Sequence, residues 1–258
     1  MILAYNDNGP GPVVVLLHGF PLDRSMWSWQ ETTLGSLYRV ITPDLRGHGQ
    51  SAAPEGIYTM EAMAEDVIET LDALQIREQV VLGGLSMGGY VALALTARYP
   101  DRFRALMLID TKAEGDTPEA ARGREELASS VEAAGNSAAV AAALLPKLFS
   151  ETTRQRRPQL IPRMREVMEK TPARAVAGAL RGMAARQDRA AELAQIAVPT
   201  LVLVGADDAI TPPDGAQKMA EAIPDAQIVI IPDAGHLAPF ENPEATNEAI
   251  LHFLQGLD

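Results

Sequence analysis

The sequence predicts an α/β fold in which helices cover both faces of a mostly parallel β-sheet. Short runs rich in β-branched residues recur along the chain with helical stretches between them, which is the pattern of such a sheet. The runs are almost continuously apolar, and this indicates strands buried on both faces, whereas a β-sandwich would alternate. With 258 residues, 47% of them hydrophobic, the chain can form one large domain or a core with one sizeable insertion.

The expected strands are the apolar runs before residue 112 and after residue 194. The opening residues, 2–5, are expected to add an antiparallel strand at the edge of the sheet. The parallel strands are expected at residues 13–17, 39–43, 79–83, 105–110, 200–204 and 227–231.

Helices are expected wherever apolar residues recur at helical spacing. Residues 60–74 have this spacing, and residues 87–99 form a small, apolar helix that should pack on the sheet. A terminal helix begins after Asn242, which can cap it, with Pro243 in the first turn. Its buried stripe is expected to consist of Ile250, Leu251 and Leu254.

Residues 112–194 have a different composition from the rest of the chain. They are rich in Ala, Arg, Glu and Met, lack β-branched runs, and are expected to form short helices broken at Pro146, Pro158, Pro162 and Pro172. From Lys112 to Glu192 the net charge is +3, against −15 for the remainder. We expect a core of residues 1–111 and 195–258, with residues 112–194 inserted over the carboxyl edge of the sheet, where ligands of open α/β sheets bind.

Composition excludes several classes of function. The absence of cysteine rules out disulfides, thiolate metal sites and cysteine nucleophiles, and is compatible with a reducing compartment. The net charge of −12 argues against nucleic acids and anionic lipid surfaces as partners. No apolar run approaches the roughly 20 residues of a membrane helix, and the N-terminus does not resemble a secretory signal. We expect a soluble, cytoplasmic protein, either a monomer or a small homo-oligomer.

The clearest chemical signal is the sequence Gly84-Leu85-Ser86-Met87-Gly88. It matches G-x-S-x-G and lies between an expected strand and an expected helix, where a nucleophilic serine is held on a sharp turn. The glycines avoid a Cβ clash, and the N–H groups that open the helix can stabilise developing negative charge. The alternative is a glycine-rich turn with an incidental serine, so the motif needs support from other residues.

Glycine-rich nucleotide-binding loops are the main competing motifs. The dinucleotide pattern G-x-G-x-x-G starting at Gly83 fails because position 85 is leucine, and no Gly-Lys-Ser or Gly-Lys-Thr occurs. Residues 47–52 fit the loose pattern, but Pro54 and Gly56 follow them and indicate a turn rather than the required helix.

A nucleophilic serine needs a histidine that is held by an acid, and the chain has four histidines. His236 follows the last expected strand, so its loop should lie at the same sheet edge as Ser86. A surface-loop histidine is the alternative interpretation. His18 is expected to position the loop that follows it, His48 to brace neighbouring loops, and His252 to lie on the terminal helix in a surface or packing role.

The acid is expected between the serine and the histidine in sequence. Asp207 and Asp208 follow the expected strand 200–204, and Asp208 is preferred, with Asp207 left to a turn or a cap. Asp110, at the end of another strand, is a lesser candidate. The acid would fix the tautomer of the imidazole and stabilise the imidazolium that forms.

With these residues in place, the chain resembles the α/β-hydrolase superfamily, and particularly its small bacterial carboxylesterases, enol-lactonases and cofactor-free perhydrolases. The resemblance covers nearly the whole length. It rests on His18-Gly19-Phe20-Pro21, on Asp44-Leu45-Arg46-Gly47-His48-Gly49-Gln50-Ser51, on the stretch from Gly83 to Tyr90, and on Gly235-His236 with Glu241 and Pro243.

The resemblance implies the α/β-hydrolase fold with a helical cap at residues 112–194. It implies Ser86 as nucleophile, Asp208 as acid and His236 as base, with the backbone N–H groups of Phe20 and Met87 as the oxyanion hole. Haloalkane dehalogenases and epoxide hydrolases of this fold use an Asp nucleophile, so serine argues against those reactions. The loop is H-G-F rather than H-G-G-G, which weakens any analogy to enzymes that resemble acetylcholinesterase or hormone-sensitive lipase.

The expected activity is that of a serine carboxylesterase acting on a small-molecule ester of short to medium chain length, without metal or cofactor. An enol-lactonase or other lactone hydrolase, or a perhydrolase, with the same triad is the alternative, and a non-catalytic receptor of the same fold is a remote one. The 112–194 segment offers apolar residues for a modest acyl pocket, although each could instead bind the segment's helices to the core: Leu144, Leu145, Leu148, Met164, Met168 and Met183.

Overall fold

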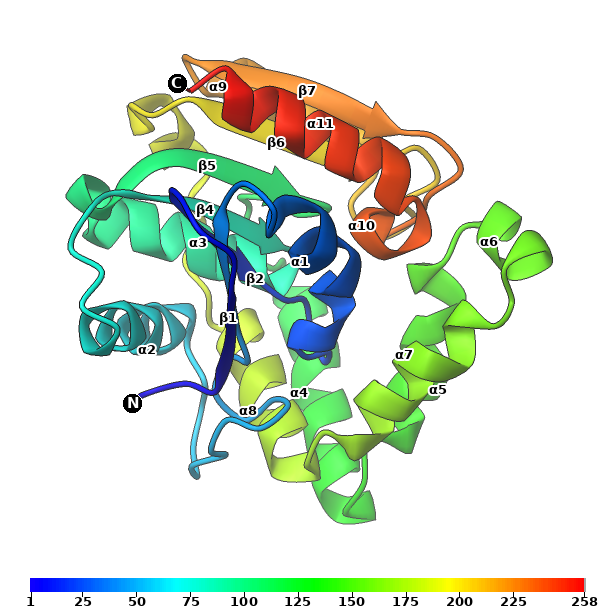
Figure 1. The fold of residues 1–258 in the computed structure, drawn as a ribbon. Helices are drawn as coiled ribbons and strands as arrows, with labels where there is room; N and C mark the ends of the chain where they lie inside the picture. Colours follow the sequence, from blue (N-terminus) through cyan, green and yellow to red (C-terminus); the bar gives the residue numbers. More distant parts are fainter. Residues whose placement is uncertain (258) are drawn as a thin grey trace.

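The sheet determines where every other part of the molecule lies. A computed structural model describes residues 1–257, and its single sheet has seven strands in the order β1-β3-β2-β4-β5-β6-β7 (Figure 1). All neighbouring strands are parallel except β1, which pairs antiparallel with β3. The strands are β1 (Tyr5–Asn8), β2 (Val13–Leu17), β3 (Arg39–Pro43), β4 (Val80–Leu85), β5 (Phe103–Ile109), β6 (Thr200–Gly205) and β7 (Ala226–Ile231).

The parallel strands lie where the sequence predicts them, but the edge strand does not. The prediction of an antiparallel edge strand is confirmed, but its placement at residues 2–5 is wrong, because β1 begins only at Tyr5 and contains the polar residues that follow. The residues before it run toward a helix instead, since the N–H of Leu3 donates to Thr70 Oγ1 at 3.0 Å. Leu3 is buried there, so its apolar character reflects packing on the helix rather than pairing in the sheet.

Helices cover both faces of the sheet, as the continuously apolar strands require. One face carries α2 (Met60–Ala73), α3 (Met87–Arg98) and α9 (Pro213–Ala222), and the other carries α1 (Ser28–Leu34) and α11 (Pro243–Gln255). Successive residues of β2 contribute to the two cores in turn, because side chains alternate along a strand. Both layers are therefore anchored on the same central strands.

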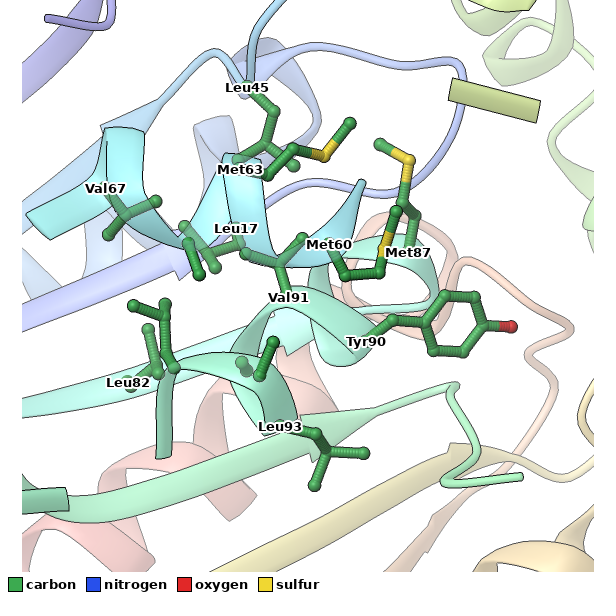
Figure 2. Close-up of a cluster of buried hydrophobic side chains, with 14 of the residues drawn as sticks. Leu17, Leu45, Met60, Met63, Val67, Leu82, Met87, Tyr90, Val91 and Leu93 are labelled. Carbon is green, nitrogen blue, oxygen red and sulfur yellow. The ribbon is translucent and has the colours of Figure 1, made fainter. Parts of the chain in front are cut away.

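The core beneath α3 fixes the helix that begins directly after Ser86. Figure 2 shows Met87 and Val91 of α3 among the side chains of Met60 and Met63 from α2, and all of them are buried in one cluster with Leu17 of β2. Burying side chains of this size contributes about 1.5–3 kcal/mol each, so the start of α3 is firmly held against the sheet.

Helices α10 (Ala238–Glu241) and α11 end the chain. The side chain of Asn242 accepts a hydrogen bond of 3.3 Å from the N–H of Ala245, as expected for a cap, and Pro243 occupies the first turn. The expected stripe is partly different: Ile250 and Leu254 are fully buried, but Leu251 is only partly buried.

Between β5 and β6 the chain is helical, in agreement with its composition. The helices are α4 (Pro118–Ala134), α5 (Ala138–Leu148), α6 (Glu151–Arg156), α7 (Leu160–Lys170) and α8 (Ala173–Ala184), and the short 3₁₀ helix η3 (Ala190–Gln195) follows them. Figure 1 shows α5, α6 and α7 beyond the end of the sheet toward which the arrowheads of β5 and β7 point. Among residues 1–257, no helix combines the length and the apolar character that a membrane crossing requires.

Two of the four prolines do not break helices, contrary to the prediction. Pro162 lies in the first turn of α7, where no N–H is needed for a bond within the helix. Pro146 lies inside α5, near its end at Leu148, and the helix continues through it although proline has no N–H to donate. Pro158 precedes α7 and Pro172 immediately precedes α8, where proline does mark a boundary.

Candidate active site

Ser86 occupies the turn between β4 and α3. Its backbone angles, φ 52° and ψ −112°, are ones that a residue with a side chain rarely adopts, and they are the strained angles expected of a serine that is presented at a sharp turn. The strain is held in place by the strand before it and by the buried helix after it. The side chain is partly exposed.

The two glycines of the motif are required by close approaches of the backbone. A Cβ on Gly84 would lie 2.2 Å from the carbonyl oxygen of Gly88, within the turn itself. A Cβ on Gly88 would lie 2.3 Å from the carbonyl oxygen of Leu17, at the end of β2. Only glycine at these positions allows the turn to close and to pack against the neighbouring strand.

His236 connects Ser86 to an acid. It lies on the loop between β7 and α10, and its Nε2 atom is 2.8 Å from Ser86 Oγ. On the other side of the ring, Nδ1 is 2.8 Å from Oδ2 of Asp208, which lies on the loop after β6. Because a carboxylate can only accept, Nδ1 carries the proton and donates to Asp208, which leaves Nε2 free to accept the Ser86 hydroxyl proton. The residue is only 2% exposed, so water does not compete for these bonds.

Asp208 is held by more donors than the imidazole alone. Its Oδ1 accepts the N–H groups of Ile210 at 2.8 Å and Thr211 at 2.9 Å, and its Oδ2 accepts the Thr211 hydroxyl at 2.7 Å. Burial alone would raise the pKa of Asp208, but the bonds from His236 and Thr211 outweigh it and hold this pKa below its ordinary value. The group is therefore a carboxylate at neutral pH.

Sequence reasoning missed Thr211. The signal was available, because an Asp followed three residues later by Thr forms a local turn in which the carboxylate accepts both the backbone N–H and the hydroxyl. The Thr211 hydroxyl also lies 3.3 Å from His236 Nδ1, so it contacts both partners of the central hydrogen bond.

The other candidate acids lie elsewhere. Asp207 is exposed, and its N–H donates to the carbonyl of Ala234. Asp110 is fully buried, but its two oxygens accept the backbone N–H groups of Gly205 and Ala238 rather than the imidazole. Asp208 is thus the carboxylate that the structure brings to His236.

The two expected oxyanion donors belong to segments that pack against each other at Ser86. Met87 is the first residue of α3, so its N–H has no partner within the helix. Phe20 follows Gly19, and a Cβ on Gly19 would lie 3.5 Å from the Cβ of Ser86. Met87 is therefore the residue after Ser86, and Phe20 is the residue after the glycine that lies against Ser86.

The remaining histidines do not reach Ser86 through any hydrogen bond of the described residues. His18 is fully buried, accepts the N–H of Leu45 at its Nε2, and lies with Nδ1 2.9 Å from the carbonyl of Gly19. His48 is also fully buried, and its ring stands 5.2 Å from that of His18. Both brace the loop that leads to Phe20, whereas His252 is exposed on α11.

The apolar residues proposed for an acyl pocket are mostly committed to packing. Met164, Met168, Leu145 and Leu148 are buried in the core cluster that includes α1 and α11, and Met183 is buried in the other core cluster. Only Leu144 of this set is partly buried. Most of these side chains are therefore buried among other apolar residues.

The arrangement can transfer a proton from an alcohol to an imidazole whose charge is balanced by a carboxylate. This is the chemistry by which a serine hydroxyl becomes a nucleophile. Within residues 1–257, no group of three or more acidic or histidine side chains is arranged to hold a metal ion.

Known proteins resemble this chain over almost its whole length. A family model described as the alpha/beta hydrolase fold matches residues 12–243. The chain is 34% identical to 3-oxoadipate enol-lactonase 1 of Acinetobacter baylyi over 257 residues, which cover 99% of this chain and 94% of that protein.

Two solved structures are similar in both sequence and shape. A thermophilic esterase from Thermogutta terrifontis is 45% identical and has a TM-score of 0.97. The alignment covers 99% of this chain and 93% of the other. The enol-lactonase of Burkholderia xenovorans LB400 is 33% identical and has a TM-score of 0.90. The alignment covers 98% of this chain and 96% of the other.

Proposed function

This chain belongs to the α/β-hydrolase fold family and is a hydrolase, and from that premise we propose that it is a serine carboxylesterase. Its substrates are carboxylic esters of short to medium chain length, cleaved through an acyl-enzyme intermediate. The observation that carries the proposal is the unbroken hydrogen-bond chain from Ser86 Oγ through the ring of His236 to Asp208, with both distances 2.8 Å.

In the first half of the reaction, the hydroxyl proton of Ser86 passes to Nε2 of His236 as Oγ attacks the ester carbonyl. The imidazolium that forms is stabilised by the carboxylate of Asp208. The backbone N–H groups of Phe20 and Met87 donate to the oxyanion, and the positive end of the α3 dipole favours the same charge. The imidazolium then gives its proton to the alkoxide, the C–O bond breaks, and the alcohol leaves.

In the second half, water replaces the alcohol. His236 takes a proton from the water molecule, whose oxygen attacks the acyl carbonyl and forms a second oxyanion in the same place. When this intermediate collapses, the proton returns to Oγ of Ser86 and the carboxylic acid is released. Two easier steps thus replace one difficult step, and the side chains end in their starting protonation states.

The esterase assignment draws on the relatives as well as on the chemistry. The protein from Thermogutta terrifontis, at 45% identity, is an esterase, and this resemblance supports ester hydrolysis as the proposed reaction. A serine nucleophile also forms an ordinary ester with the acyl group, which water hydrolyses readily, whereas substitution at a saturated carbon uses a carboxylate nucleophile. The reaction class is therefore acyl transfer to water.

The test is hydrolysis of p-nitrophenyl esters from acetate to decanoate by the wild-type protein and by Ser86→Ala. We expect turnover in the wild type, with the highest kcat/KM at short or medium chains, and a loss of about 10³-fold or more in the variant. Ser36→Ala, at an exposed serine far along the chain from the motif, is the matched control and should behave as the wild type. Wild-type protein that cleaves none of these esters at a rate dependent on Ser86 would contradict the proposal.

Lactone hydrolysis is the second candidate. A lactone is an ester whose alcohol stays attached, so the same groups act on it, and two relatives at 33% and 34% identity are enol-lactonases. A lactone panel assayed beside the esters separates the two functions. A kcat/KM for any lactone that exceeds the best ester by tenfold would assign the protein as a lactonase with the same triad.

A further inference from the structure

Asp110 joins the two loops that carry the proposed acid and base. It follows β5 directly and is fully buried, and its Oδ1 accepts the N–H of Gly205 at 2.8 Å. Its Oδ2 accepts the N–H of Ala238 at 3.0 Å. Gly205 ends β6 just before the turn of Asp208, and Ala238 follows His236 by two residues. One carboxylate therefore spans the gap between the acid turn and the histidine loop.

The residues on either side of Asp110 hold the third member of the triad. The carbonyl of Ile109 accepts the backbone N–H of Ser86 at 3.0 Å. The hydroxyl of Thr111 donates to the carbonyl of Ser86 at 2.8 Å. Three consecutive residues at the end of one strand thus contact the chain segments of the nucleophile, the acid and the base.

Burying a carboxylate at this position is energetically unfavourable. Burial disfavours its charge and so raises the pKa of Asp110, and the nearby charge of Asp208 raises it further. A neutral side chain of similar volume would avoid both penalties, yet it would leave one or both backbone N–H groups without an acceptor. What the carboxylate adds is two acceptors at a fixed separation.

We propose that Asp110, with Thr111, is a positioning residue for the triad: it fixes the spacing of the loops that carry Asp208 and His236 while Thr111 fixes the turn of Ser86. The proposal rests on the proposed function, because it assigns these residues to the proton transfers described above. Asp110 does not touch the imidazole or the serine hydroxyl, so it acts through the loops that it bonds.

Asp110→Asn is the sharpest variant because it preserves shape while removing one acceptor. The amide has a single oxygen, so its NH₂ group must face one of the two backbone N–H groups, and one loop is released. A displacement of about 1 Å in a reacting group can lower turnover by about 10²-fold. We therefore expect kcat to fall by about 10- to 100-fold with KM changed by less than about threefold.

Thr111→Val provides a second, milder test that does not depend on how well Asp110→Asn folds. It removes the hydroxyl bonded to Ser86 at nearly constant volume, and we expect kcat to fall by about three- to tenfold. Thr111→Ser keeps the hydroxyl and should restore kcat. If the role of these residues were merely structural, Asp110→Asn and Thr111→Val would both lower thermal stability and leave kcat per folded molecule unchanged.

Asp66→Asn is the matched control for the loss of a buried carboxylate. Asp66 lies on α2 with its side chain 1% exposed, and it bonds Arg46 and the terminal amine rather than any segment of the triad. We expect it to lower the melting temperature while leaving kcat near the wild-type value. If Asp110→Asn and Thr111→Val, corrected for the folded fraction by circular dichroism, also keep wild-type kcat, the proposal is wrong.

A fluorophosphonate probe separates failure of this inference from failure of the proposed function. The probe phosphonylates an activated serine whatever the natural substrate is, and Ser86→Ala serves as the blank. We expect the labelling rate of Asp110→Asn to fall in parallel with kcat. A wild-type protein that is not labelled would overturn the serine-hydrolase function itself, whereas equal labelling rates for the wild type and Asp110→Asn would overturn only the positioning role.

Discussion

The backbone N–H of His236 donates a hydrogen bond of 3.0 Å to the carbonyl oxygen of Leu148. Leu148 is the last residue of α5, so the helical segment between β5 and β6 directly holds the residue whose ring contacts Ser86. Close by, the N–H of Ser150 donates to Glu241 at 2.8 Å. The segment over the sheet edge and the histidine loop are therefore one hydrogen-bonded unit, and displacing the segment would displace the imidazole.

Glu241 is the centre of that unit, and its amide variant should loosen both sides. Its carboxylate is fully buried and accepts the N–H of Gly235 at Oε1 and that of Ser150 at Oε2, both at 2.8 Å. Glu241→Gln leaves one oxygen to accept from both segments, and losing a hydrogen bond to a charged group costs about 1.5–3 kcal/mol. We expect kcat to fall about tenfold and hydrogen exchange at the Ser150 amide to become faster.

Glu248→Gln is the matched control, because Glu248 lies exposed on the neighbouring α11. Its kcat and its exchange pattern should match those of the wild type. Unchanged exchange at Ser150 in Glu241→Gln, measured by mass spectrometry or NMR, would show that Glu241 does not couple the two segments.

Thr211→Val tests the hydroxyl that supports the acid. Removing the 2.7 Å bond from Thr211 Oγ1 to Asp208 takes away one of the groups that lower the pKa of Asp208, and it leaves Oδ2 bonded to the imidazole alone. We expect kcat/KM on p-nitrophenyl acetate to fall about tenfold, with recovery in Thr211→Ser. Equal losses in the valine and serine variants would mean that the methyl group rather than the hydroxyl matters.

The choice between two adjacent aspartates gives a prediction with a built-in control. Asp208→Asn should remove the ionic partner of His236 and favour the wrong imidazole tautomer, so we expect kcat to fall by about 10³- to 10⁴-fold. Asp207→Asn changes the neighbouring residue, whose side chain is exposed, and should stay within about twofold of the wild type. Comparable losses in the two variants, measured under the same conditions, would remove Asp208 from its proposed role.

The parts of the fold that sequence predicts well are those in which local pattern and burial agree. The strand β3, for example, lies at the predicted residues because its apolar run is buried as a strand between the two layers of helices. The edge strand differs because an edge needs no apolar side chains: β1 pairs through the backbone of polar residues, while apolar Leu3 serves the core beside α2. Pro162 failed as a boundary because the first turn of a helix needs no N–H from that position, whereas Pro146 lies inside α5 without ending it.

The candidate site was predictable where a residue carries its own chemical signature. Ser86 and His236 lie in recognisable sequence contexts after strands, and parallel strands bring such positions to one sheet edge. Asp110 and Glu241 were noted in the sequence, but their partners were not foreseeable. Asp110 accepts the N–H of Gly205 and Glu241 that of Ser150, donors about 90 or more residues away, and a backbone donor leaves no trace in the amino-acid type.

Two buried histidines predict how stability should depend on pH. Burial lowers the pKa of His18 from 6.5 to about 4 and that of His48 from 6.5 to about 3, so both rings are neutral in the folded protein at neutral pH. Below pH 6.5 the unfolded chain binds protons at these rings and the folded protein does not. Each of these two rings therefore contributes a decrease in the free energy of unfolding as the pH falls from about 6.5 to about 4, by about 3 kcal/mol.

His48→Asn tests this assignment because the amide can replace the ring as a donor without titrating. His48 Nδ1 lies 3.0 Å from the carbonyl of Arg46, a position that the asparagine NH₂ group can take. Urea unfolding at a series of pH values should show that the variant loses about 3 kcal/mol less stability between pH 6.5 and 4 than the wild type does. His252→Asn, at an exposed histidine, should follow the wild-type curve. A wild-type slope retained in His48→Asn would mean that other groups, and not this ring, make the fold sensitive to acid.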